Sequence, residues 1–275
     1  MIQHIALVRD GPDPPMSELS QVAAAIQKQV MRDFGPAWDI EATVGAFPSL
    51  EDVPTDYWKA TVIADIGSSA YGFHRTETGQ PYALIQWRDH WSISASHEIL
   101  EMLADPGGDR LIAGQSPHPE QGRVQFLVEV CDPCADDAYH YTVNNVPVSC
   151  FYTKRYFDPV TAPGVQYSFT EDINEPRKVL PGGYLTWLEP ETNTWWQQWH
   201  FDGANKFFVI DPDVAAYGSL RSAVDQIPPP AKARKAKPGR KTTQAIKAKR
   251  AQGVSAQAAC AARFRAEIAR WRKPL

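Results

Sequence analysis

The chain is poor in cysteine, and it has neither a leader-like N-terminus nor a long apolar run. Its 275 residues include four cysteines, which argues against a disulfide framework and favours a reducing compartment. The opening residues MIQHIALVRDGPDPP lack the basic and then apolar regions of a secretory signal. No stretch of about 18 apolar residues is present, so no membrane span is predicted. We expect a cytoplasmic protein; release by a non-signal route and association with a virion stay open.

Acidic residues are almost missing from the C-terminal stretch. Residues 232–275 hold 14 Lys and Arg residues against one acid, Glu267, which is a net charge of +13. Residues 1–231 hold 14 basic and 31 acidic residues, which is a net charge of −17. An acidic body with a basic extension indicates two segments with different tasks.

A proline run, Pro228–Pro230, marks the boundary between these segments. We predict a folded domain over residues 1–226 and a basic tail over residues 227–275, partly flexible and with a terminal helix. Cationic segments bind phosphate backbones without reading sequence. Residues 232–273 could therefore bind nucleic acid nonspecifically, or an acidic partner, and the simpler alternative is a solvated tail that pairs with its own acidic body. The sequence does not predict an oligomeric state.

The stretch Ser96–Pro106 combines metal-binding and proton-transferring side chains at helical spacing. His97 and Glu101 are four residues apart, so on a helix they project from one face and could grip one metal ion. The pattern is that of the HExxH zinc helix with Glu in place of the second His. Asp105 is eight residues from His97, about 12 Å along a continuous helix, so it cannot share that ion. The alternative is an ordinary solvated surface helix without a metal site.

A catalytic zinc usually takes three protein ligands and leaves a fourth position for water. The ion lowers the pKa of that water, and a nearby carboxylate accepts its proton during attack on a carbonyl. We assign that role to Glu98, with His97 and Glu101 as two ligands. Glu129 and Asp132, which lie at the end of a predicted strand, are the candidates for the third. The sequence therefore predicts a metal-dependent hydrolase of a peptide-like bond; zinc is the expected ion, and another divalent cation would also suit a carboxylate ligand.

The pattern of apolar residues predicts an α+β fold. The order of the expected elements resembles that of zincin catalytic domains, which implies a twisted mixed sheet, a backing helix and the active-site helix. The backing helix is expected from Ser17, its N-cap, to Gly35-Pro36, and Ser96 is expected near the start of the active-site helix. Strands are expected over residues 2–8, 38–47, 60–66, 82–87 and 124–130, with hairpins over 139–152 and 184–199. Loops are expected over 67–79, where His74 could line a cleft, and over 109–123.

Several segments together resemble a known group of proteins. They are Tyr71-Gly72-Phe73-His74, Gly79-Gln80-Pro81, Trp91-Ser92, Ser96-His97-Glu98 through Asp105-Pro106, and Glu129-Val130-Cys131-Asp132-Pro133-Cys134. The combination resembles an uncharacterised bacterial and phage family of zincin-like, metallopeptidase-type proteins with an HExxE motif. The SHExxE…DP segment is also similar to that of plant exordium-like, phosphate-induced proteins. The resemblance covers residues 2 to about 199 and implies a zincin-like fold and a metal site, but no substrate. Zincins with a downstream Glu ligand favour Glu129 as the third ligand.

Other groups admit a chemical and a plain structural interpretation. His140 could donate a hydrogen bond to a developing oxyanion, or it could have only a surface role. Cys131 and Cys134 form a C-x-x-C pair without a second pair, which favours a structural role. Trp187, Trp195, Trp196 and Trp199 could stack on a ligand or could pack a sheet face. For the whole chain, the competing hypothesis is a noncatalytic, metal-stabilised binding or structural protein.

Overall fold

The structure is a computed structural model, and it describes residues 2–67, 70–77, 79–217, 219–225 and 227–230. The expected basic tail over 232–273 and its terminal helix lie outside the described residues. The first compact unit of the chain spans Met1–Ala236. It is of the α+β class, as predicted, with two five-stranded sheets and one two-stranded sheet. No helix among the described residues is long and apolar enough to span a bilayer.

The first sheet has the strand order β2-β1-β3-β5-β4. Its strands are β1 (Gln3–Arg9), β2 (Ala42–Phe47), β3 (Trp58–Ile63), β4 (Gly72–Glu77) and β5 (Gln80–Gln86). The first four in the order run parallel, and β4 pairs with β5 in the antiparallel sense at one edge. Ile5, Ala6, Leu7 and Val8 of β1 are fully buried, as expected for a central parallel strand.

Strand β4 corrects the expectation of a loop over residues 67–79. Its sequence GFHRTE is polar, and Gly79, which helps to join it to β5, has a φ of 80°. Those features are typical of turns, but they also suit the edge of a sheet, where one side of the strand has no neighbour. Pairing with β5 decided the structure of this segment.

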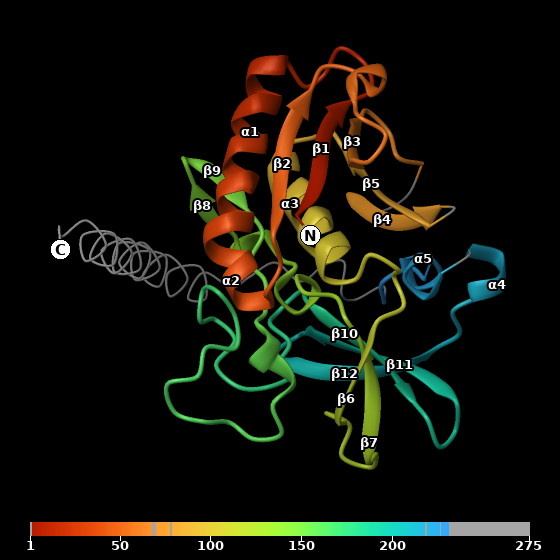
Figure 1. Ribbon diagram of the computed structural model, residues 1–275. Helices are drawn as coiled ribbons and strands as arrows, with labels where there is room; N and C mark the ends of the chain where they lie inside the picture. Colours follow the sequence, from red (N-terminus) through yellow and green to blue (C-terminus); the bar gives the residue numbers. More distant parts are fainter. Residues whose placement is uncertain (1, 68–69, 78, 218, 226, 231–275) are drawn as a thin grey trace, which may run out of the picture. The chain divides into compact units, whose positions relative to one another are not determined.

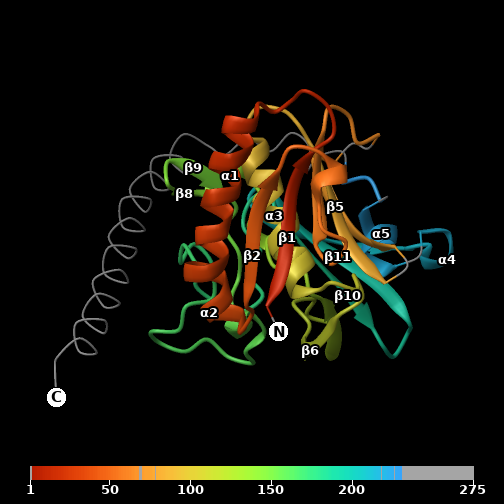
Figure 2. The same cartoon turned by 45° about the horizontal axis from the view of Figure 1, so that its top comes forward.

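Two helices pack on the first sheet (Figures 1 and 2). Helix α1 (Met16–Gln29) contacts β1 and β2, while α3 (Trp91–Ala104) contacts β3, β4 and β5. The Ser96 hydroxyl donates to Gln29 Oε1 at 2.9 Å, so the two helices lie side by side.

Both helices begin earlier than expected, and the first also continues past its expected end. α1 begins at Met16, with Pro15 as its N-cap, and the chain stays helical beyond Gly35-Pro36 through a π-turn (Val30–Phe34) and α2 (Gly35–Trp38). Proline is tolerated there because it occupies the first turn of α2. α3 begins at Trp91, so Ser96 lies inside the helix, where it is fully buried.

The second sheet is antiparallel, with the order β12-β11-β10-β7-β6. Its strands are β6 (Leu111–Gln115), β7 (Arg123–Leu127), β10 (Tyr184–Glu189), β11 (Thr194–Phe201) and β12 (Ala204–Ile210). β6 lies in the expected loop over 109–123, which its pairing with β7 overrides. Trp187 is fully buried, with its ring centroid 6.1 Å from that of Phe126. That tryptophan therefore packs the core and is not part of an exposed stacking surface.

The segment after β7 returns to α3. Strand β7 ends at Leu127, earlier than predicted, so Glu129 follows the strand and Asp132 opens a 3₁₀ turn, Asp132–Cys134. The predicted hairpin around Asn144-Asn145 is confirmed: β8 (Tyr141–Val143) pairs with β9 (Val146–Val148). The two asparagines have φ values of 51° and 65°, as a two-residue hairpin turn requires.

Candidate metal centre

His97 and Glu101 meet on one face of α3, as their helical spacing predicts. The distance from His97 Nε2 to Glu101 Oε2 is 3.2 Å. The Glu101 side chain is fully buried, while that of His97 is 14% exposed. The pair thus reaches solvent through His97 alone.

Asp132 completes a group of three potential ligands. Asp132 lies in the 3₁₀ turn after β7, and its Oδ1 is 3.2 Å from His97 Nε2. One ligand atom from each of His97, Glu101 and Asp132 lies within 4.8 Å of the other two. One nitrogen and two oxygens form a donor set that suits a zinc-like ion and leaves further positions open.

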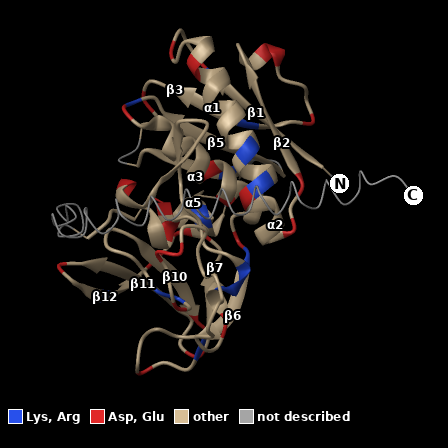
Figure 3. Ribbon diagram, turned by 90° about the vertical axis from the view of Figure 1, so that its left-hand side faces the viewer, with Lys and Arg blue, Asp and Glu red and all other residues tan. Residues whose placement is uncertain are grey.

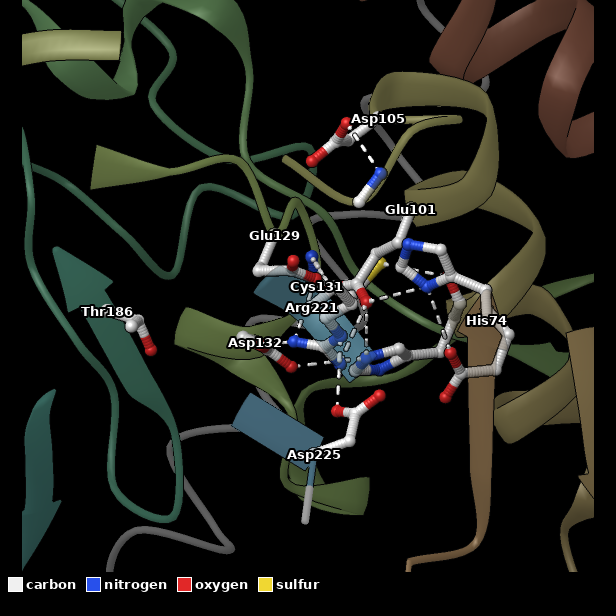
Figure 4. Close-up of polar contacts among 12 residues, drawn as sticks. His74, Glu101, Asp105, Glu129, Cys131, Asp132, Thr186, Arg221 and Asp225 are labelled. Carbon is white, nitrogen blue, oxygen red and sulfur yellow. Dashed lines mark hydrogen bonds and ion pairs between the residues drawn. The ribbon is translucent and has the colours of Figure 1, made fainter. Parts of the chain in front are cut away.

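The orientation of Glu101 is set by the backbone. Its Oε1 accepts a hydrogen bond of 3.0 Å from the backbone N–H of Cys131 (Figure 4). Its Oε2 has no hydrogen bond within the described part of the chain, but it lies 3.2 Å from His97 Nε2 and 3.5 Å from Arg221 Nη2 in ion pairs. Oε2 therefore already faces cationic groups, which is the side on which a metal ion would be bound.

Electrostatics couple these groups strongly. Burial alone would raise the pKa of Glu101, but the charges of His97 and Arg221 outweigh it and lower that pKa. Burial alone would lower the pKa of His97, yet Glu101 and Asp132 raise it well above its usual range. Without an ion, the imidazole therefore holds a proton that neutralises part of the acidic cluster.

Glu98 faces β4, next to Glu101 on α3. It is 4% exposed, and its Oε2 lies 3.4 Å from His74 Nδ1. A Cβ atom at Gly72 would lie 2.8 Å from Glu98 Cγ, so only glycine lets the strand approach so closely. His74, Glu98 and Glu101 form a second group with ligand atoms within 4.8 Å of one another. Glu101 is shared by both groups.

His74 belongs to the site more intimately than the sequence indicated. It is 1% exposed, and its Nε2 has no hydrogen-bond partner among the described residues. The sequence suggested only that it could line a cleft from a loop. Recognising β4 as a strand would have placed its alternate residues, Gly72 and His74, on the same face of the sheet as each other.

Glu129 lies beside an arginine instead of beside His97. Its Oε2 is 2.8 Å from Nη1 of Arg221, which comes from α5 (Leu220–Asp225). Burial raises the pKa of Glu129 well above its usual range, although Arg221 opposes the rise. Asp132, and not the favoured Glu129, is thus the downstream carboxylate that the structure brings to His97.

Arg221 is the residue that sequence analysis missed. It is 3% exposed and contacts four carboxylates, those of Glu101, Glu129, Asp132 and Asp225. Figure 3 shows basic residues in blue and acidic residues in red along the described chain, with α3 and α5 labelled. No sequence signal marks it, because it is a single arginine in a short polar segment near the expected domain boundary.

Asp105 and His140 lie outside both groups of potential ligands. Asp105 accepts hydrogen bonds from the backbone N–H groups of Gly108 at 3.0 Å and Arg110 at 2.9 Å, so it closes the turn after α3. This agrees with its expected exclusion from the ion. His140 belongs to neither group of potential ligands, and its Nδ1 contacts the Asp137 carbonyl. Its role as an oxyanion donor stays a prediction.

The cysteines of the described region are buried and free of disulfides. Burial raises the pKa of the Cys131 and Cys134 thiols well above the usual range. Neutral, buried thiols are poor nucleophiles and poor ligands. These side chains therefore fit the structural role that the single C-x-x-C pair favoured.

Compared with protein-family models, with curated proteins and with solved structures, the chain gives no match. The assignment of function therefore depends on the site itself.

Proposed function

We propose that the chain is a metal-dependent hydrolase of a peptide-like bond, with a zinc-like ion held by His97, Glu101 and Asp132. The observation that carries the proposal is the buried group of these three residues, whose ligand atoms lie within 4.8 Å of one another. Glu98, one position after His97 on the same helix, supplies a carboxylate beside them. This combination of ligands and base is what the HExxE pattern predicts.

The residues around the site fit a divalent cation. Arg221 is surrounded by the carboxylates of Glu101, Glu129, Asp132 and Asp225. One guanidinium cannot balance them, and buried charges need partners or protons. Oε2 of Glu101 lies within ion-pair distance of both His97 and Arg221, so it lies where positive charge is needed. When bound, a divalent ion polarises a carbonyl and lowers the pKa of water.

The surrounding fold also supports a zincin-like assignment. A twisted sheet, a backing helix (α1) and a buried helix that carries the motif (α3) are the parts expected of zincin-like domains. The resemblance of the segments from Tyr71 to Cys134 points the same way. We therefore propose that the described unit is a zincin-like domain.

Glu98 would act as the proton acceptor. Its Oε2 is 3.4 Å from His74 Nδ1. Gly72 lies close against its side chain and limits the positions that the carboxylate can take. A carboxylate held in this way can take the proton of an attacking water and pass it to the leaving amine. Strand β4 lies at the edge of its sheet, where an extended peptide can pair with unpaired backbone groups. This edge supports a peptide-like substrate.

Metal analysis of the purified full chain tests the proposal. We expect about one equivalent of tightly bound divalent ion, and Glu98→Gln should keep the ion while lowering peptide hydrolysis by about 100- to 10,000-fold. Glu120→Gln, at an exposed position, is the matched control. A chain with no affinity for zinc, manganese or calcium would overturn the proposal. A metal-loaded chain that cleaves no member of a broad peptide library would support the noncatalytic alternative.

The charge of residues 232–275 favours a second candidate function. We propose that this segment, with a net charge of +13, binds nucleic acid without sequence preference. The same charge would also suit an acidic protein partner. The salt dependence of nucleic-acid binding separates this function from that of the metal centre.

A further inference from the structure

Arg221 divides its contacts between the metal group and the carboxylates around it. Its Nη1 lies 2.9 Å from Asp132 Oδ2, and its Nη2 lies 3.5 Å from Glu101 Oε2. The other oxygen of Asp132, Oδ1, is the atom that lies 3.2 Å from His97. The guanidinium therefore holds the outer oxygen of Asp132 and leaves the inner one directed at the ligand group.

The same guanidinium also holds Glu129 and Asp225. Nη1 is 2.8 Å from Glu129 Oε2, and Nε is 3.1 Å from Asp225 Oδ1 (Figure 4). Both carboxylates are buried. Glu129 would otherwise be a free carboxylate only three residues from Asp132, and a competitor for the same ion.

Helix α5 is firmly anchored to the rest of the described unit. The backbone N–H of Arg221 donates to the Gly108 carbonyl at 2.8 Å, directly beyond the end of α3. Leu220 and Val224 pack on Leu127 in one apolar cluster. These contacts fix the backbone of Arg221, while the surrounding carboxylates fix its guanidinium.

We propose that Arg221 is a positioning residue that selects Asp132 over Glu129 as the third metal ligand. It does so by binding the outer oxygen of Asp132 and by keeping Glu129 in an ion pair. Partners in the outer shell of a metal site orient its ligands and tune its affinity. This inference rests on the proposed metal site, and it names the residue that decides which carboxylate becomes the third ligand.

If Arg221 acted only by electrostatic repulsion, its removal would raise the affinity of the site for the metal ion. A guanidinium near a divalent ion weakens binding unless its own charge is balanced. Here Glu129 and Asp225 lie within 3.1 Å of it and provide that balance. Loss of Arg221 should therefore disturb the orientation of Asp132 more than it relieves repulsion.

Metal binding by Arg221 variants of the full chain tests the proposal. For Arg221→Gln we expect affinity for Zn²⁺ and Co²⁺ to fall about 10- to 100-fold, and Arg221→Lys should recover part of the loss. The visible spectrum of the Co²⁺-loaded Arg221→Gln protein should shift, because a freed Glu129 enters the coordination sphere. Adding Glu129→Gln should reverse that shift, whereas Glu129→Gln alone should leave the wild-type spectrum unchanged.

Controls separate this role from a general loss of folding. Arg177→Gln removes a half-buried arginine whose guanidinium contacts the Asp158 and Pro159 carbonyls, and it should change neither affinity nor spectrum. If Arg221→Gln does not fold, Asp225→Asn decides, since it loosens the guanidinium without touching a ligand; a smaller loss of affinity in the same direction is expected.

The outcomes distinguish the two proposals. Unchanged or tighter binding in the folded Arg221 variants, or in Asp225→Asn where Arg221→Gln does not fold, with an unchanged Co²⁺ spectrum, would overturn the role of Arg221. A wild-type chain that binds neither Zn²⁺ nor Co²⁺ would instead overturn the metal site.

Discussion

Gly72 of β4 lies directly against Glu98 of α3, and a Cβ atom at that glycine would approach Glu98 Cγ to 2.8 Å. The strand thus restricts the residue that we propose as the base. No positive φ is involved at Gly72, so its need for glycine is one of space.

Gly72→Ala should therefore displace Glu98 without disrupting the fold. The clashing atoms belong to a flexible side chain, so we expect a stability loss of no more than about 1–3 kcal/mol. Hydrolysis should fall by about 100-fold or more because the base is misplaced, while metal content stays unchanged. Calorimetry, metal analysis and peptide hydrolysis measure these effects. Gly122→Ala, where an added Cβ meets nothing within 4 Å, should change none of them.

The two downstream carboxylates should differ in their effect on metal binding. Asp132→Asn removes a proposed ligand, so affinity should fall by more than the roughly 10- to 100-fold that supporting residues contribute. Glu129→Gln should have a much smaller effect because Glu129 pairs with Arg221. Competition with a chelator gives both affinities. The reverse order would identify Glu129 as the third ligand.

Metal binding should release a proton from His97. Burial lowers the pKa of His97, but Glu101 and Asp132 raise it well above its usual range. At neutral pH the imidazole is therefore protonated without the ion and must be neutral to bind it. Affinity should rise with pH until that pKa is passed. Titration calorimetry in buffers of different ionisation enthalpy should show release of about one proton; no release at pH 7 would contradict the assignment.

Ser96→Ala should destabilise the junction between the two helices. The Ser96 hydroxyl donates to Gln29 Oε1 and accepts from the Ser149 backbone N–H, both at 2.9 Å. Removal leaves buried polar groups unpaired, which costs about 1–3 kcal/mol. Denaturant unfolding of the metal-free protein measures the loss. Ser49→Ala, which removes a solvent-exposed hydrogen bond to Asp52 Oδ2, should cost far less.

Deletion of residues 232–275 tests the basic segment. If the segment neutralises six to ten phosphates, affinity for DNA should fall about 10³- to 10⁵-fold between 50 and 200 mM salt, and the truncated chain should lose this binding. Fluorescence anisotropy at several salt concentrations measures both. Metal content should stay unchanged on truncation. Equal, salt-insensitive DNA binding by both chains would contradict a nucleic-acid role.

The spacing of residues along the sequence was a good guide where the residues lie within one regular helix or strand. The pairing of His97 with Glu101 follows from the helical repeat, and short apolar segments indicated the central strands β1, β3 and β5. Polar strands were missed: β4 and β6 have sequences that suit loops, and only pairing with a neighbouring strand makes them extended. Edge position, which depends on the sheet order, explains both errors.

The sequence by itself determined the α+β class, the contrast between acidic body and basic tail, and the His97–Glu101 face of α3. The tertiary structure decided which distant residues join that face: Asp132 instead of Glu129, His74 from an edge strand, and Arg221 from α5. The physical reason is that helical periodicity acts over four residues. Contacts across 24 to 120 residues of chain depend on how the sheets and loops pack, which no local pattern records.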